Sequence, residues 1–125
     1  MQTLDEQIQN LGTYLKKLKK VITTEASFSF GGSKVVSKTR VDDIICCIQA
    51  SYPQDFRDYV KRNGIRSLQS NLCLQQILAT ATKKFILSSS HYLINYAYLE
   101  TLINTFMQTT QKEIQKVQDD SNFKL

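Results

Sequence analysis

The stretch from residue 67 to residue 111 is almost free of ionic side chains, and this feature constrains the fold most. Its only formally charged side chains are Lys83, Lys84 and Glu100. The other residues mix Leu, Ile, Phe and Tyr with uncharged Gln, Asn, Ser and Thr. Because a surface helix of a monomer normally carries Lys, Glu and Arg on its solvent side, we expect this stretch to be shielded from water. The shield is either the rest of the chain or a partner.

Glycine and proline are scarce, with four glycines and one proline in 125 residues. The turns of a many-stranded sheet depend on these residues, so long helices with few connections are favoured. A chain of this length suits one domain. The sequence therefore predicts an all-α fold, a single-domain bundle of four to five helices over residues 1–125. Residues 119–125 are expected to form a frayed tail.

The N-terminal segment has the clearest helical periodicity. Thr3 and Glu6 match a capping box, and a helix is predicted over residues 3–22. Because the apolar seam is shorter than three heptads, it is expected to pack within a bundle or against another chain. The seam residues recur at intervals of three and four: Leu4, Ile8, Leu11, Leu15, Leu18 and Ile22.

Residues 26–36 allow two interpretations. Phe28 and Phe30 alternate with serines before the pair Gly31-Gly32, which is a typical signal of a short hairpin. An isolated two-stranded ribbon is only marginally stable. A loop that the two phenylalanines hold in place is therefore an equally good prediction.

The remaining helices are predicted from apolar spacing and from residues that stop helices. Two short helices are expected over residues 39–50 and 53–62, because Pro53 cannot lie inside a helix and Asn63-Gly64 is typical of a helix end. Two longer helices are expected over residues 67–87 and 90–118. The serines between them mark the predicted reversal.

Thiol and imidazole side chains are few: Cys46, Cys47, Cys73 and His91. The cysteines are expected in the core, because free cysteine is among the most buried residue types. His91 is expected at a helix start, behind a serine cap. A zinc site that has little histidine needs about four thiolates. The sequence therefore predicts no metal, no cofactor and no catalytic residue, and a protein that is not an enzyme.

The chain shows no signal for export or membrane insertion. Its first residues lack the basic and apolar regions of a secretion signal, and no run approaches the ~18 apolar residues of a membrane helix. An odd number of cysteines, two of them adjacent, does not suit a disulfide framework. The sequence therefore predicts an intracellular protein of the cytoplasm or nucleus, without membrane association.

The charge-poor stretch supports a first functional hypothesis, a non-catalytic helical assembly or adaptor subunit. A helix over residues 90–118 would be ~42 Å long, more than a compact domain of this size covers. Interface centres are poor in Lys and Glu and rich in aromatic residues and Met. A protein partner or self-association is therefore expected. The predicted interface consists of Tyr92, Tyr96, Leu99, Ile103, Phe106 and Met107.

The positive charge supports an alternative hypothesis, a small nucleic-acid-binding protein. The formal net charge is +5, and residues 57–66 hold four basic side chains against one acidic one. The order helix, Gly64, helix is reminiscent of a helix-turn-helix. If folding gathers the basic residues, they would contact phosphates. The predicted contacts are Arg57, Lys61, Arg62 and Arg66, with Lys16, Lys17 and Lys20 from the first helix.

Overall fold

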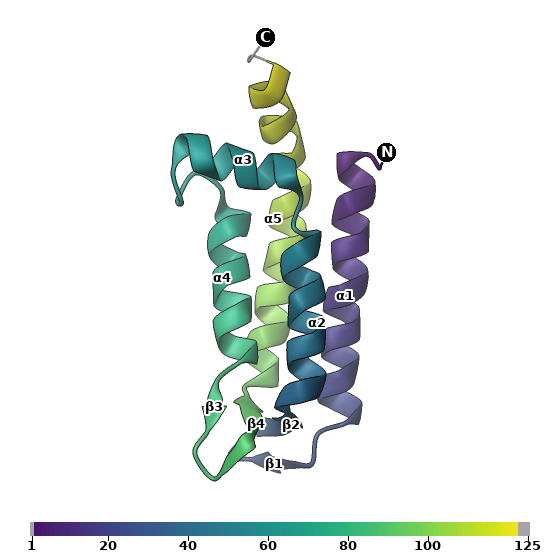
Figure 1. Cartoon of the computed structure of the whole chain (residues 1–125), viewed down its shortest axis with the longest axis vertical. Helices are drawn as coiled ribbons and strands as arrows, with labels where there is room; N and C mark the ends of the chain where they lie inside the picture. The colour runs from purple at the N-terminus through teal and green to yellow at the C-terminus, as the bar shows by residue number, and fades with distance from the viewer. Residues whose placement is uncertain (1, 123–125) are drawn as a thin grey trace.

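The computed structural model describes residues 2–122, and these form five helices and a four-stranded antiparallel sheet (Figure 1). The fold is therefore α+β, and the predicted all-α helical bundle is wrong. In chain order the elements are α1 (Leu4–Thr24), β1 (Phe28–Phe30), β2 (Ser33–Ser37), α2 (Lys38–Ser51), α3 (Gln54–Asn63), α4 (Gln69–Ala81), β3 (Lys84–Phe85), β4 (Ser88–Ile94) and α5 (Tyr96–Asn122).

Four helices form the long body of the molecule. Helices α1, α2, α4 and α5 run lengthwise beside one another, α3 crosses one end, and the sheet closes the other end (Figure 1). Helix α5 contacts α1, α3 and α4, and α1 also contacts α2. Because α2 follows β2 directly and α5 follows β4 almost directly, the two central strands determine where both helices begin.

The sheet has the strand order β1-β2-β4-β3, so two hairpins join through the pairing of β2 with β4. This arrangement shortens two predicted helices, since α4 ends at Ala81 and α5 begins at Tyr96. The serines predicted as a reversal between helices are instead the first residues of β4. Ser, aromatic and β-branched side chains dominate residues 84–94. These residue types are poor helix formers, and the pairing of β4 with β2 and of β3 with β4 provides partners for their backbone groups.

The first hairpin confirms one of the two interpretations of residues 26–36. Strands β1 and β2 pair with Phe30 opposite Ser33, so Gly31 and Gly32 form a two-residue turn. Both have positive φ, 56° and 85°. This is the backbone of the hairpin turn that matches strand twist, and glycine adopts it without steric cost.

The apolar seam predicted in the first helix is confirmed. All six of its residues are buried, and they belong to a core that includes side chains from every helix and from β2 and β4. The capping box is also present, with the Thr3 hydroxyl accepting a hydrogen bond from the Glu6 backbone N–H at 3.1 Å. The observed start of this helix therefore follows from local sequence alone.

A buried carboxylate joins α5 to the start of α4. Glu113 accepts hydrogen bonds from the backbone N–H groups of Gln69 at 2.7 Å and Ser70 at 3.2 Å. Leu68, at the N-cap of α4, has no side chain that could do this, so Glu113 caps the helix from a distant part of the chain. The hydroxyl groups of Tyr52 and Ser70 lie 2.7 Å apart beside it. Burial raises the pKa of Tyr52 to about 12.

The cysteine and histidine predictions are mostly wrong. Cys73 is buried and its thiol contacts the Leu102 carbonyl oxygen at 3.2 Å; burial raises the pKa of this thiol. Cys46 and Cys47 are exposed on α2, because Ile44, Ile45 and Ile48 occupy its buried face. His91 lies within β4, not at a helix start.

The C-terminal helix continues through part of the predicted tail. Helix α5 extends to Asn122, so residues 119–122 are helical. Asp120 accepts a hydrogen bond from the Arg62 guanidinium, which ties this last segment to α3. Residues 123–125 of the predicted tail lie outside the described residues.

Replacing Glu113 tests the junction between α5 and α4. We expect Glu113→Ala to lower the free energy of unfolding by about 2 kcal/mol, since two buried N–H groups lose their acceptor. Glu113→Gln keeps an acceptor oxygen but not the charge, so its effect should be about 1 kcal/mol. Urea denaturation measures both. Gln111→Ala, exposed on the same helix, is the control. A Glu113→Ala variant with the same free energy of unfolding as the wild type would contradict the capping role.

Candidate functional site

The two faces of the sheet differ in what covers them. Side chains alternate between faces along a strand, and Val36 and Ile94 belong to the main core. Phe28, Val35 and Leu93 are opposite one another across three strands, so they occupy the other face. We call this the outer face, because it is directed away from the helices.

Aromatic side chains dominate the outer face. The rings of Phe28 and Phe30 make T-shaped contacts with Phe85, with centroids 6.1 and 5.6 Å apart. Val35 and Phe85 are buried but lie outside the main core. The two phenylalanines of β1 therefore cover a small apolar cluster, and their own rings remain in contact with solvent.

Four apolar side chains at this end are strongly exposed. The exposed fractions are 51% for Phe28, 48% for Phe30, 95% for Ile86 and 69% for Leu87. Ile86 and Leu87 form the two-residue tip between β3 and β4, where Phe85 pairs with Ser88. A hairpin tip has no neighbour in its own chain to pack against. The fold thus presents Ile86 and Leu87 to solvent.

Two adjoining hollows lie beside these side chains, each with a volume of about 340 Å³. The first hollow, at the hairpin tip, is almost entirely apolar. The second hollow, beside Tyr98, reaches α5. Lys83 and Leu93 line both, so the hollows form one continuous surface. We define the sheet-end surface by the residues that expose or line it: Phe28, Phe30, Lys83, Lys84, Ile86, Leu87, Leu93 and Tyr98.

The charge of the sheet-end surface is positive. Lys83 and Lys84 line the first hollow, and no described Asp or Glu lines either hollow. Within residues 2–122, the carboxylates in ion pairs are Glu25, Glu100 and Asp120, whose partners are other basic residues. The two lysines therefore lie beside apolar side chains without a carboxylate partner in the described structure.

Polar contacts hold the sheet against the helices. The Tyr92 hydroxyl of β4 donates to the Asp42 carboxylate of α2 at 2.6 Å. This hydrogen bond raises the pKa of Tyr92 to about 12, with a smaller contribution from burial. Arg40 donates to both oxygens of Glu25 at 2.8 Å, and these hydrogen bonds lower the pKa of Glu25. The first contact fixes the sheet to α2, and the second joins α2 to the C-terminal end of α1 beside the sheet.

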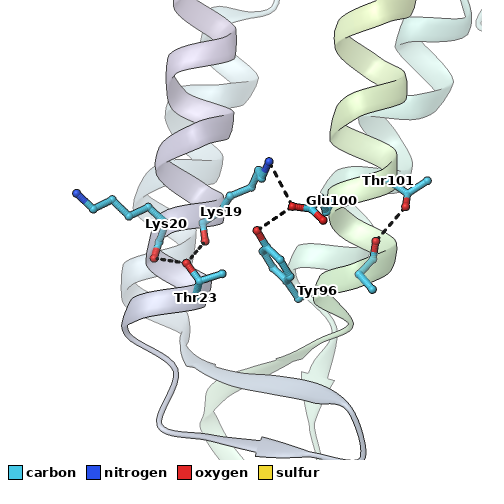
Figure 2. Close-up of polar contacts among 7 residues, drawn as sticks. Lys19, Lys20, Thr23, Tyr96, Glu100 and Thr101 are labelled. Carbon is cyan, nitrogen blue, oxygen red and sulfur yellow. Dashed lines mark hydrogen bonds and ion pairs between the residues drawn. The ribbon is translucent and has the colours of Figure 1, made fainter.

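Helices α1 and α5 are joined next to the sheet (Figure 2). Lys19 forms an ion pair with Glu100 at 3.6 Å, and the Tyr96 hydroxyl donates to the same carboxylate at 3.3 Å. Lys20 points away from α5 in this view. The lysines of α1 therefore lie in the half of the molecule that is closed by the sheet.

Comparison with protein-family models, curated proteins and solved structures finds no match. No three His, Cys, Asp or Glu side chains among residues 2–122 are grouped so that they could hold a metal ion. None of the helices in this described part is both long and apolar enough to cross a bilayer.

The six predicted interface residues, five on α5 and Tyr92 on β4, are largely engaged in contacts within the protein itself. Leu99, Ile103 and Phe106 are buried in the main core. Tyr92, Tyr96 and Met107 are partly buried and pack against that core. A partner could reach few atoms of these six side chains.

Uncharged polar residues stand at the exposed positions of the charge-poor stretch, where ionic residues are usual. The exposed positions of α5 between Tyr98 and Gln111 carry Thr, Asn and Gln, and those of α4 carry mainly Gln. The sequence predicted that the whole stretch is shielded from water, and this prediction is wrong for its outward positions. Its outward positions contact water with amide and hydroxyl groups in place of ionic ones.

The predicted nucleic-acid contacts are not gathered on one face. Arg57 donates to the Tyr52 carbonyl oxygen at 3.0 Å and also to that of Gln49, and it thereby satisfies the C-terminal end of α2. Arg62 is paired with Asp120. Lys61 and Arg66 are exposed at the α3 end.

The three lysines predicted as further phosphate contacts lie elsewhere. Lys16, Lys17 and Lys20 are exposed on α1, and the neighbouring Lys19 contacts Glu100 in the first turns of α5. Those turns follow the sheet, whereas α3 crosses the opposite end (Figure 1). The basic groups of α1 and α3 are thus separated along the length of the molecule.

The start of α4 also differs from a DNA-reading helix. Ser70 is buried and bonded to Tyr52, and the Asn71 side-chain amide donates to the Ile65 carbonyl oxygen at 3.0 Å. The Ser67 hydroxyl donates to the Gly64 carbonyl oxygen at 2.6 Å. Side chains that would have to reach base edges are used to hold the α3–α4 turn.

A comparison of two arginines tests the structural role of Arg57. We expect Arg57→Ala to lower the free energy of unfolding by about 1–2 kcal/mol, because the last carbonyl groups of α2 lose their donor. Arg66→Ala should change it by less than about 0.5 kcal/mol, since Arg66 is exposed. Chemical denaturation distinguishes the two. Equal effects of the two substitutions would refute this role of Arg57.

Proposed function

We propose that this protein is a non-catalytic assembly or adaptor subunit that binds a protein partner through the sheet-end surface. One observation carries the proposal: the outer face of the sheet is apolar, and its most prominent side chains are exposed. An antiparallel sheet with helices on one side normally presents polar residues on the other side. Here the other side carries Phe28, Phe30, Val35, Phe85 and Leu93.

The size and composition of the exposed patch support binding. Phe28, Phe30, Ile86 and Leu87 together expose apolar area on the order of 400 Å², which matches the largest patches found on monomers, and those are often functional. Phenylalanine and tyrosine are enriched at the centres of protein interfaces. The patch would form the centre of an interface, with polar residues around it.

The arrangement around the single histidine supports a non-catalytic role. The Nδ1 atom of His91 lies 2.8 Å from the Ser88 hydroxyl and 3.0 Å from that of Ser90. A nucleophile and its base need a third group that orients the base. The hydrogen-bond partners of His91 in the described structure are the two serine hydroxyls, which fits a role in the hairpin.

A nucleic-acid-binding role has less support. Arg57 and Arg62, two of the four basic residues proposed in the segment 57–66, are engaged within the fold. Lys61 and Arg66 are exposed at the end opposite the sheet. These two side chains alone would give weak, strongly salt-dependent phosphate binding.

Site-specific photo-crosslinking in the native cell tests the proposed function. A photoreactive amino acid at Leu87 should give a protein adduct heavier than the 14.4 kDa chain. The same amino acid at Ile65 is a matched control, because Leu87 and Ile65 are each 69% exposed and Ile65 lies at the opposite end. Denaturing gels and mass spectrometry identify the adducts.

Two results of this experiment would contradict the proposal. One is the absence of a protein adduct at Leu87, including the case in which only lipid or nucleic acid is crosslinked. The other is the same set of adducts at Leu87 and Ile65, since that would reflect random collision rather than a defined surface.

A further inference from the structure

We infer that the occupant of the sheet-end surface is an acidic amphipathic segment of the partner, with apolar side chains that enter the two hollows and carboxylates that pair with Lys83 and Lys84. This inference rests on the proposed function and specifies the chemistry of the partner.

The two chain segments that build the sheet supply only positive charge, and the carboxylates nearest to them, Asp42, Glu25 and Glu100, are bonded to Tyr92, Arg40 and Lys19. Residues 26–41 contain no Asp or Glu, and neither do residues 59–99. These two segments build all four strands. Lys83 and Lys84 therefore attract carboxylates at a site where the surrounding apolar side chains reduce screening by water.

The order of groups along the surface defines what a matching segment must present. Lys83 lines both hollows, so a positive charge lies between the apolar hollow at the hairpin tip and the hollow beside Tyr98. A complementary segment has an apolar side chain for each hollow and a carboxylate between them. Apolar residues three or four positions apart on a helix, with acidic neighbours, meet this requirement.

The same charge argues against a second copy of the chain as the occupant. In a two-fold symmetric contact each copy uses the same patch. Lys83 and Lys84 of one copy would then approach those of the other copy. Like charges at an interface are costly, and no described carboxylate lines the hollows to compensate.

The shape of the surface favours a peptide over a flat anionic bilayer. The apolar side chains surround hollows of about 340 Å³ each, and such concave sites are suited to individual side chains of a ligand. A bilayer surface supplies negative charge but has no side chains that fill two separate hollows. Vesicle binding is therefore included in the test as a competing outcome.

Fluorescence anisotropy with two designed peptides tests the inference on the full chain. The acidic peptide has about 15 residues, with leucines at helical spacing and glutamates elsewhere on that face. The basic peptide has the same leucines and lysines in place of the glutamates. We expect the wild-type protein to bind the acidic peptide at least about tenfold more tightly than the basic one, with affinity falling as salt increases.

Two double variants separate charge from apolar contact. Lys83→Glu with Lys84→Glu should reverse the preference between the peptides. Ile86→Ser with Leu87→Ser should weaken binding of the acidic peptide about tenfold or more. Matched controls at the opposite end are Lys61→Glu with Arg66→Glu and Ile65→Ser with Leu72→Ser, which should bind as the wild type does. Circular dichroism verifies that every variant folds.

Each contrary outcome overturns the inference in a distinguishable way. If the wild type binds both peptides equally and the Ile86/Leu87 variant binds neither, the surface binds protein but does not select for acidic segments. No binding of either peptide would exclude an acidic segment, and the Leu87 crosslinking result decides separately whether a protein binds there. Lysine-dependent binding to phosphatidylserine vesicles without peptide binding would identify a membrane. A dimer in sedimentation that the Ile86/Leu87 variant abolishes would identify a second copy.

Discussion

The antiparallel pairing of β2 with β4 is the constraint on which the rest of the structure depends. It joins Lys34 to Ile94 and Ser37 to His91, residues that are far apart in the sequence. Without it, each hairpin would be an isolated two-stranded ribbon of marginal stability. The pairing buries Val36 and Ile94 against the helices. On the opposite face it brings Phe28, Val35 and Leu93 together, so it creates the apolar outer face.

Local sequence signals predicted some elements well and failed at others for a physical reason. The seam of α1 and its Thr3 cap depend on residues close in sequence, and both were predicted; the Gly31-Gly32 turn was one of two equal predictions for residues 26–36. Strand β4 depends on β2, whose paired residues lie far earlier in the sequence (Ser37 with His91, Lys34 with Ile94), and β3 depends on β4; no local pattern in residues 84–94 indicates the partner of β4. The second half of the chain was therefore predicted as helix, with a reversal where β4 begins.

The candidate site was missed because a shortage of charge was interpreted as burial. The exposed positions of α4 carry mainly Gln, and those of α5 between Tyr98 and Gln111 carry Gln, Asn and Thr, while the predicted interface residues Leu99, Ile103 and Phe106 lie in the core. A usable signal was present elsewhere: Phe85-Ile86-Leu87 stands between two lysines and three serines, a short apolar run flanked by polar residues. The roles of Arg57 and Arg62 depend on backbone and side-chain partners that only the tertiary structure reveals.

The lengths of the outermost strands have a consequence for colloidal behaviour. β1 has three residues and β3 has two, and each has one unpaired side in the described sheet. Edges this short offer few backbone groups to an incoming strand, so the sheet is a poor template for fibrils.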